Sequence, residues 1–443
     1  MLKTFRQALQ IEEIRKKLGF TFLMLIVVRL GSQLPTPGVN PDFIKSFFAS
    51  QTGEAFNFFN AFTGGSFEQM SIFALSISPY ITSSIVVQML QMVIPKLNEW
   101  NEQGDAGKQK VNRVTRYVTV AIAMIQALVI IFSLGAKPEN ILGDSLIQYK
   151  NVYWLIYLYM AVVVTAGSAF VMWLADLITR HGIGNGSSMI ISAGIISSLP
   201  TMFTTLYFKY LEGSVITTGN FFLFVLVVLL YIAMIIGVVF FEGSVRKIPV
   251  QYANRQAGQK GSDIPVKLNS ASVIPVIFAS SLMSFPGIIM MLIGKSNIEG
   301  VGGHILNALS QQNWCSLKQP WYSVGLLIYI LLVVFFAYFY TSITFNPLEI
   351  ANNMKRQGGF VPGLRPGKPT SDFLAKILNY IIFIGAIGLI IVAVIPIFFN
   401  GVFGASVSFG GTSLIIVVGV VLETIKQVEA QLVNRHYKGF LND

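Results

Sequence analysis

Apolar runs of membrane-spanning length recur along the chain, and the clearest extends from Phe221 to Phe241 without a charged residue. An α-helix needs roughly 20 apolar residues to cross the hydrocarbon core of a bilayer. Of the 443 residues, 53% are hydrophobic and 12% are charged, against about 25% charged in a typical soluble protein. The short alternating segments of a membrane β-barrel do not occur in the sequence. The sequence therefore predicts an all-α polytopic membrane protein.

Ten membrane spans are expected from the apolar runs. Their approximate first residues are Leu18, Ile72, Tyr117, Val152, Ser187, Phe221, Ser272, Tyr322, Ile377 and Thr412. The first run follows a basic start, as the apolar part of a secretory signal does. It lacks the small-residue cleavage pattern of a signal, however, and nine further spans follow it. We therefore expect it to be a retained first helix.

Positive charge is distributed unevenly between the two sides of the predicted membrane protein. The side that holds both termini carries 24 of the 31 Lys and Arg residues. The opposite side carries 6, and Arg29 lies within the first span. Loops rich in Lys and Arg stay in the cytoplasm. Both termini are therefore expected to be cytoplasmic, and the net charge of +11 belongs mainly to that face.

Two long arms on the expected cytoplasmic side, residues 242–271 and 346–376, differ from the shorter loops. Each carries five Lys or Arg residues against two acidic residues, and glycine and proline punctuate the second arm. Such arms predict docking sites for a large partner. Anionic lipid would also be attracted to a basic cytoplasmic face without any protein partner. Both explanations are compatible with the residues.

A short motif recurs in two of the predicted spans. The second span contains P-x-I-x-x-S at residues 79–84, and the seventh contains it at residues 275–280. Both spans are the second of a group of five, and two consecutive groups of five run in opposite directions. Interrupted helices at matching positions of an inverted repeat point to a transport pathway. The motif predicts matched helix interruptions in two inverted halves, residues 1–206 and 207–443.

Ionisable and nucleophilic residues are few within the expected spans. Arg29 alone lies inside one, whereas ion-coupled transporters use such groups to bind or relay the ion. Snorkelling or local pairing also explains Arg29. The single cysteine, Cys315, cannot form an internal disulfide, and Gly182–Gly186 is expected to be a tight turn rather than a phosphate loop. No enzyme activity and no cofactor are expected, and an inverted-repeat transporter of a small solute is the alternative to a channel.

Six stretches of the sequence together carry a family resemblance. They are "FNAFTGGSFEQMSIFALSISPYI", "WLADLITRHGIGNGSSMIISAGI", "RKIPVQYANRQ", "VIPVIFASS", "FNPLEIANNMKRQGGFVPGLRPG" and "FGGTSLIIVVGVVLE". In this order they resemble the SecY/Sec61-alpha family of protein-translocation channels. The resemblance implies a ten-helix clamshell of two inverted halves around an hourglass pore. It also implies a channel that passes unfolded polypeptides and releases membrane segments laterally into lipid.

The resemblance further implies a ring of aliphatic side chains at the narrowest point of the pore. Carried over to this chain, the ring consists of Ile77, Ile81, Ile191, Ile277 and Ile416. Ile77 and Ile81 are four residues apart, which places them on one helix face. Branched aliphatic side chains can part around a polypeptide while they offer no ligand to a hydrated ion. Ser187 stands where the family commonly has another aliphatic residue, so a complete six-membered ring is in doubt.

A plug outside the constriction and a lateral gate toward lipid are implied as well. The plug is expected near residues 58–70, with Phe58, Phe62, Gly64, Gly65 and Phe67 as its candidate residues. The gate candidates are Thr82, Ser83, Gln88, Ser280 and Phe285. Ser and Thr side chains also commonly bond to carbonyls of their own helix, which is the alternative explanation for those positions.

The resemblance identifies partners for the two basic arms. The expected partner-binding residues are Arg246, Lys247, Arg255, Lys260, Lys355, Arg356 and Arg365. Arginine pairs well with the carboxylates of a motor protein and with the phosphates of ribosomal RNA, so SecA and the ribosome are the implied partners. SecE and SecG are implied as partner subunits in a bacterial plasma membrane. Signal peptides and unfolded preproteins are the implied cargo.

Overall fold

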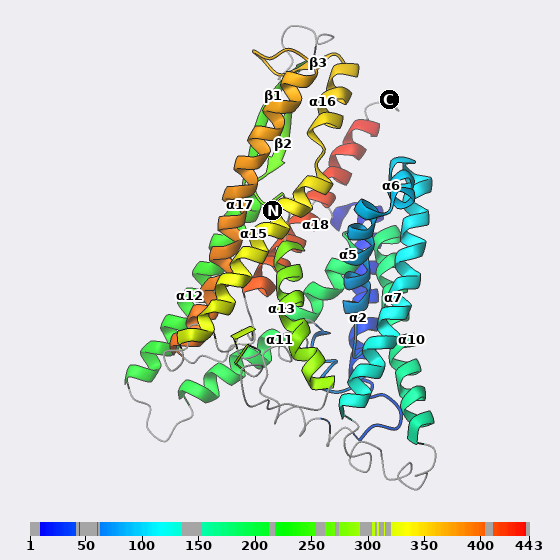
Figure 1. The fold of residues 1–443 in the computed structure, drawn as a ribbon, viewed down its shortest axis with the longest axis vertical. Coiled ribbons are helices and arrows are strands. Elements are labelled where there is room, and N and C mark those ends of the chain that lie inside the picture. The colour runs from blue at the N-terminus through cyan, green and yellow to red at the C-terminus, as the bar shows by residue number, and fades with distance from the viewer. Residues whose placement is uncertain are drawn as a thin grey trace. The chain divides into compact units, whose positions relative to one another are not determined.

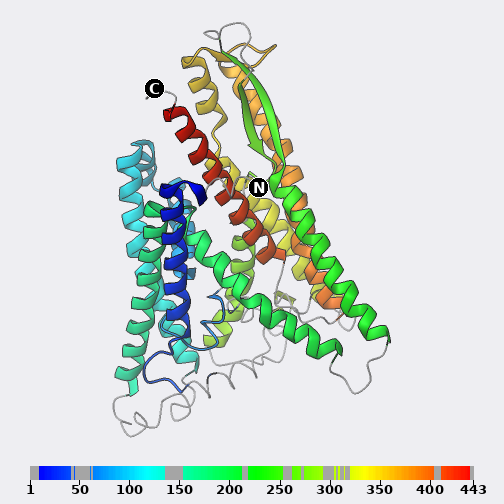
Figure 2. The same cartoon turned by 180° about the vertical axis from the view of Figure 1, so that it is seen from behind.

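The structure, a computed structural model, consists mainly of long helices (Figures 1 and 2). It describes residues 9–40, 44, 60, 63–134, 153–211, 218–252, 262–270, 274–292, 304–305, 308–309, 314, 320–403 and 411–439. The chain divides into two compact units. Unit 1 comprises Met1–Met202, Ile288–Ile298 and Glu423–Asp443, and unit 2 comprises Phe203–Gly287 and Glu299–Leu422. The predicted inverted halves stay a prediction.

Ten long helices among the described residues correspond to the ten predicted spans. They are α2 (Glu12–Gln33), α5 (Ser78–Val93), α7 (Asp105–Leu134), α10 (Tyr153–His181), α11 (Gly186–Leu211), α12 (Thr218–Gly243), α13 (Ile274–Leu292), α15 (Val324–Thr344), α17 (Lys368–Phe403) and α18 (Gly411–Gly439). Within the part of the chain that the structure describes, five helical segments are long and apolar enough to cross a membrane by length and composition alone. They are Ala106–Phe132, Tyr153–His181, Phe224–Gly243, Trp321–Arg356 and Lys368–Phe398.

The second predicted span begins later than expected. Helix α5 begins at Ser78, not near Ile72, because the preceding residues are bonded to the end of α2 instead of forming helix. The backbone N–H of Ile72 donates to the carbonyl of Leu34 at 2.9 Å, and the non-glycine Ser76 has a φ of +48°. A left-handed backbone conformation of this kind is incompatible with a continuing right-handed helix.

The two motif prolines do not interrupt their helices, which corrects the prediction of matched interruptions. Pro79 is the second residue of α5, and Pro275 is the second residue of α13. The first turn of a helix accepts proline, because the N–H groups there have no partner within the helix. The motif therefore marks two helix beginnings. In each copy the proline is the second residue of its helix.

Unit 1 contains a bundle of four long helices (Figure 2). Helix α7 packs against α5 and α10, and α10 also packs against α2. The small residues Ala127 and Ala161 are fully buried in the apolar core, where they let the helices approach closely. Arg116 of α7 forms an ion pair with Asp176 of α10.

The predicted tight turn at Gly182–Gly186 is confirmed, since it joins α10 to α11 and Gly184 has a φ of +89°. Side chains from two other helices bind its backbone. The N–H of Ile183 donates to Thr21 Oγ1, and the N–H of Gly184 donates to Gln427 Oε1, each at 3.0 Å. This turn therefore holds the C-terminal part of α18 against α2 within unit 1.

Unit 2 combines helices with a small sheet that the sequence analysis did not predict. Strand β1 (Val245–Tyr252) pairs antiparallel with β2 (Ser262–Lys267) and with β3 (Gly359–Phe360), in the order β2-β1-β3. In Figure 1 the sheet lies beside the short helix α16 (Pro347–Arg356) and the N-terminal end of α17. The first basic arm is therefore largely a β-hairpin, not an irregular loop.

Candidate functional site

The expected plug region forms a compact turn that is bonded to itself. We call the described residues Asn60 and 63–70 the plug-candidate segment. Gly64 and Gly65 have φ values of +68° and +85°, which glycine adopts at little cost. The N–H of Gly65 donates to the carbonyl of Asn60 at 2.8 Å, and Ser66 Oγ donates to the carbonyl of Thr63 at 2.9 Å. The two glycines thus reverse the chain, and local hydrogen bonds keep it reversed.

Asn60 closes this turn with its side chain. Its Nδ2 donates to Glu68 Oε2 at 2.7 Å, and its Oδ1 accepts from the N–H of Glu68 at 3.1 Å. Phe67 is buried in the apolar core of unit 1, and its role in a plug stays a prediction. Phe58 and Phe62, the other aromatic plug candidates, lie outside the described residues. Neither Asn60 nor Glu68 was singled out in the sequence.

The C-terminal end of the plug-candidate segment is bonded to the chain that follows α2. Thr36 donates to the carbonyl of Met70 twice, through its N–H at 3.0 Å and through Oγ1 at 2.7 Å. An isolated bridge joins Pro35 to Ser71. Met70 is 2% exposed and has a φ of +45°. This end is fixed by several contacts and by burial together.

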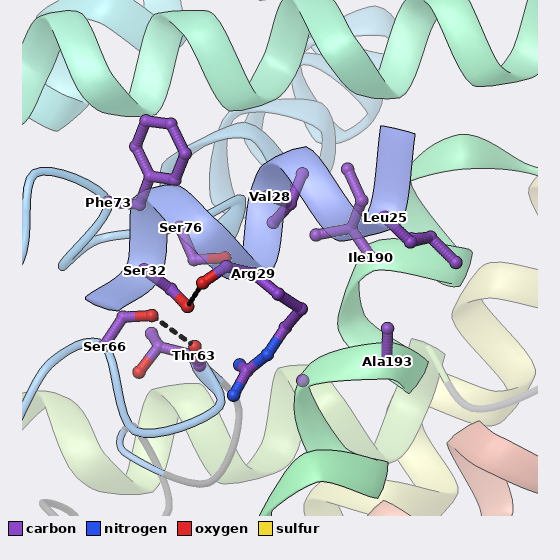
Figure 3. A pocket seen from close by; sticks show the side chains of 11 residues that line it. Leu25, Val28, Arg29, Ser32, Thr63, Ser66, Phe73, Ser76, Ile190 and Ala193 are labelled. Carbon is purple, nitrogen blue, oxygen red and sulfur yellow. Dashed lines mark hydrogen bonds between the residues drawn. The ribbon is translucent and has the colours of Figure 1, made fainter. Parts of the chain in front are cut away.

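Arg29 of α2 reaches the other end of the same segment. Its Nη1 donates to the carbonyl of Gly64 at 2.9 Å. Figure 3 shows the side chain extending from α2 toward the space between Thr63 and Ala193. This space belongs to a small pocket whose lining also includes Ser32, Ser66 and Ser76. Arg29 therefore has a partner, a backbone carbonyl, near the C-terminal end of α2.

The five predicted ring residues fall in both units. Ile77, Ile81 and Ile191 belong to unit 1, and Ile277 and Ile416 belong to unit 2. Ile77, Ile191 and Ile416 are buried, and Ile81 and Ile277 are half-buried. Ile77 is the N-cap residue of α5, and its carbonyl accepts from the N–H of Ile81 at 3.2 Å. A common ring of all five side chains stays a prediction.

The polar gate candidates on α5 bond within their own helix. Thr82 Oγ1 donates to the carbonyl of Ser78 at 3.1 Å, and Ser83 Oγ donates to the carbonyl of Pro79 at 2.6 Å. Gln88 Nε2 donates to Ser84 Oγ at 3.3 Å. On α13, Ser280 is buried, and the side chain of Phe285 lies outside the described part of the chain. These bonds match the alternative explanation, and a gate role stays a prediction.

The sheet joins the two basic arms, which were predicted as separate segments. Gln251 and Tyr252 of the first arm pair with Phe360 and Gly359 of the second. We call residues 245–252, 262–267 and 347–367 the two-arm platform. Its predicted partner-binding residues that the structure describes are all exposed: Arg246, Lys247, Lys355, Arg356 and Arg365. Arg255 and Lys260 lie outside the described residues. The two-arm platform therefore carries exposed basic residues from both arms.

Apolar side chains hold the two-arm platform together. Val250 of β1 packs with Met354 of α16 and with Val361, and all three are buried. The ring of Tyr252 lies so close to Gly359 that a Cβ there would come within 2.8 Å of it. Asn346 is the N-cap residue of α16, and its side chain accepts from the N–H groups of Leu348 and Glu349. The basic residues thus stand on a packed base.

The exposed Arg365 lies in a turn between two glycines. Gly363 and Gly367 have φ values of +85° and +105°, and Thr370 Oγ1 donates to the carbonyl of Arg365 at 2.9 Å. The glycines permit the left-handed backbone that the turn requires. The hydrogen bond orients the backbone of Arg365 and leaves its guanidinium available to a partner.

A pattern in the sequence indicates the sheet, although the sheet was not predicted. Ile248 and Val250 alternate with exposed residues in β1, and the tripeptide Ile-Pro-Val recurs at 248–250 and 264–266. Alternation of apolar and polar residues with period two is the mark of a half-buried strand. Two such runs with turn residues between them predict a hairpin. The proline in each run disfavours a strand, because it has no backbone N–H to donate to a neighbouring strand.

The chain resembles known proteins along its whole length. The profile of the SecY family matches residues 71–425. Protein translocase subunit SecY of Bacillus subtilis (strain 168) is 41% identical over 455 residues, which cover 100% of both chains. Its counterpart in Halalkalibacterium halodurans is 41% identical over 453 residues, again with 100% coverage of both.

Solved structures share the fold at low sequence identity. A structure described as that of a protein-conducting channel aligns with a TM-score of 0.63 and 17% identity, covering 95% of this chain and 93% of the other. A structure that concerns the SecY plug domain and the closed state aligns with a TM-score of 0.65 and 18% identity, covering 95% and 92%. Sec61 in a canine ribosome-channel complex aligns with a TM-score of 0.59 and 18% identity, covering 95% and 93%.

These observations first define a class. The chain is an all-α polytopic membrane protein with the fold of protein-conducting channels, which confirms the predicted fold class. The identity to curated relatives along the full chain is far above what a shared fold alone produces. The chain belongs to the SecY family.

Proposed function

We propose that this protein is the pore-forming subunit of a protein-translocation channel, which passes unfolded polypeptides across a membrane and releases membrane segments laterally into lipid. The observation that carries the proposal is the 41% identity to translocase subunits along the entire chain. The alternative, a small-solute transporter, has no support among these relatives. The long apolar helices are suited to cross the membrane in which such a channel lies.

The pore is sealed in this proposal by Ile77, Ile81, Ile191, Ile277 and Ile416. Their burial or half-burial suits residues that face protein rather than lipid. A narrow aliphatic constriction resists wetting and so excludes ions, and flexible side chains can separate around an extended polypeptide. The plug-candidate segment adds a second barrier on the side away from the cytoplasm.

The two-arm platform is the docking surface for the driving partners in this proposal. The described chain offers exposed Arg and Lys on a packed base, which suits the carboxylates of SecA and the phosphates of ribosomal RNA. A structural neighbour, Sec61, was solved in a ribosome-channel complex. We place both termini and the platform in the cytoplasm of a bacterial plasma membrane, with SecE and SecG as partner subunits.

The test of the function is translocation by purified components. The protein is reconstituted with SecE and SecG in vesicles, and SecA, ATP and an unfolded preprotein are added. Protease protection of the preprotein inside the vesicles is the expected result. Saturable uptake of a small solute by the protein alone, without preprotein protection, would establish the transporter instead.

A second test addresses the seal. Replacing Ile81→Gly together with Ile277→Gly removes two branched side chains from the predicted ring, and we expect several-fold higher ion conductance in planar bilayers. The matched control is Ile232→Gly with Ile235→Gly, because both isoleucines are exposed on α12. Equal conductance of the ring variant and the wild type would refute the ring assignment.

A further inference from the structure

Arg29 is a charged residue within a predicted span, and such a residue needs a partner. In the part of the chain that the structure describes, the ion pairs are Lys16–Glu12, Lys17–Glu13 and Arg116–Asp176, so no carboxylate there pairs with Arg29. Its hydrogen bond goes to the carbonyl of Gly64 in the plug-candidate segment, 35 residues away in sequence. A charge that binds one backbone carbonyl is suited to a contact that forms and breaks.

Gly64 is fitted closely between Arg29 and a second helix. A Cβ at this position would collide with the Arg29 guanidinium and would lie 2.8 Å from the Cα of Gly194 in α11. Gly65 has a similar positive φ, but a Cβ there would meet nothing within 4 Å. The two adjacent glycines therefore share a backbone requirement, and Gly64 alone also needs the space.

The two ends of the plug-candidate segment are held in different ways. Met70 is held by two bonds from Thr36 and by burial, and Ser71 is bridged to Pro35. At the other end, Arg29 is the described side chain of α2 that reaches Gly64. The Gly64 end is also buried at Thr63 and Ser66, so the Arg29 bond is the contact from α2 that it would lose, whereas Met70 and Ser71 would stay attached to the chain after α2.

The pocket around Arg29 has a mixed lining. Ser32, Thr63, Ser66 and Ser76 line it beside apolar residues that include Leu25 and Ile190, so the guanidinium keeps some polar neighbours when Gly64 departs. In Figure 3 the Arg29 side chain points into this lining, whereas Ser32 and Ser66 donate to other carbonyls.

We propose that Arg29 is a positioning residue that latches the plug-candidate segment in its seated state through the Gly64 carbonyl. This inference rests on the proposed channel function for its consequence, because an unlatched plug opens the pore. The contact itself is local to unit 1 and can be tested without any translocation.

The test measures the exposure of a buried position in the segment. Ser66 is 1% exposed, and Ser66→Cys in a Cys315→Ser background supplies one thiol. The full chain with its partner subunits is placed in nanodiscs, and labelling by a polar maleimide is timed. We expect Arg29→Met to raise the labelling rate roughly 10- to 100-fold, the range for losing a hydrogen bond to a charged group. Arg29→Lys keeps a cationic donor and should restore part of the protection.

Alanine variants at the two glycines provide a second, matched test, which stays informative if the Arg29 variants do not fold. Gly64→Ala should raise labelling about as much as Arg29→Met, and Gly65→Ala much less. The double variant Arg29→Met with Gly64→Ala should add little to either, because both changes break the same contact. Equal rises for Gly64→Ala and Gly65→Ala would reject the latch, since backbone strain would then explain both. Unchanged labelling in Arg29→Met would reject it as well.

Conductance separates this inference from the channel proposal. Arg29→Met should also raise the leak in planar bilayers. Higher labelling without a change in conductance, in a protein whose Ile81→Gly, Ile277→Gly variant is also tight, would keep the latch and refute the channel. A leaky ring variant beside an Arg29→Met variant with normal labelling would keep the channel and refute the latch.

Discussion

The plug-candidate segment and the two-arm platform are both built around non-helical backbone, and they are stabilised in different ways. The platform is held by strand pairing and by an apolar cluster that includes Val250 and Met354. The plug-candidate segment has no strand pairing among its described residues, and its turn is closed by side chains that bond to backbone, including Asn60 and Arg29.

This difference suits two different tasks. A docking surface must present charges in a constant arrangement, and a base of paired strands supplies it. A movable barrier must leave its site at a small free-energy cost, and side-chain hydrogen bonds contribute about 1 kcal/mol each on a net basis. The comparison predicts that the platform resists single polar changes and fails on core changes, whereas the plug-candidate segment responds to polar changes.

The largest expected effect is on partner-driven activity. Arg365→Glu reverses the charge of an exposed guanidinium, so we expect it to abolish ATP-driven secretion into vesicles while the protein still folds and binds SecE. Lys368→Glu is the control, because it places the same charge on a nearby exposed residue. Normal translocation by Arg365→Glu would remove the platform from the docking role.

The next effect tests the apolar base of the platform. Ile248→Asp puts a carboxylate at a position of β1 that is 3% exposed, and we expect it to destabilise the sheet by about 3 kcal/mol or more. Hydrogen exchange of the β1 amides should accelerate, and SecA and ribosome binding should weaken together. Gln251→Asp introduces the same side chain at an exposed position and should have little effect. Separate loss of one partner would show that the arms act independently.

A smaller effect is expected in the plug-candidate segment. Asn60→Ala removes both bonds to Glu68, which should cost about 2 kcal/mol and raise maleimide labelling of Ser66→Cys. Gln69→Ala changes a neighbouring polar residue for which the structure describes no hydrogen bond, and it should label like the parent. If Asn60→Ala stayed as protected as the parent, side-chain bonds would not hold the segment, and the contrast with the platform would fail.

The smallest effect is expected at the polar residue that caps helix α16 of the platform. Asn346→Ala removes the N-cap of α16, which should cost about 1 kcal/mol. Faster hydrogen exchange should be confined to the first turn of α16, and partner binding should stay near normal because Met354 and Ala351 keep the helix packed. Asn352→Ala, at an exposed position of the same helix, is the control. Loss of partner binding in Asn346→Ala would show that the platform depends on single polar groups after all.

Hydrophobicity by itself determined the fold class and the approximate positions of the ten long helices, because a bilayer requires about 20 apolar residues for each crossing. The family of the chain was readable from motifs, and so was the Gly182–Gly186 turn. The beginning of α5 was misplaced, because Ile72 is as apolar as a helix interior requires. Its backbone bond to Leu34 and the left-handed conformation of Ser76 keep it out of the helix.

Tertiary structure alone decided which distant residues act together. Arg29 and Gly64 are joined by one hydrogen bond, and the two basic arms are joined by the pairing of Tyr252 with Gly359. Neither pairing has a periodic pattern along the chain, because each depends on where the backbone returns after a long intervening segment. Periodicity reports the environment of one segment, whereas a contact between segments requires the coordinates of both.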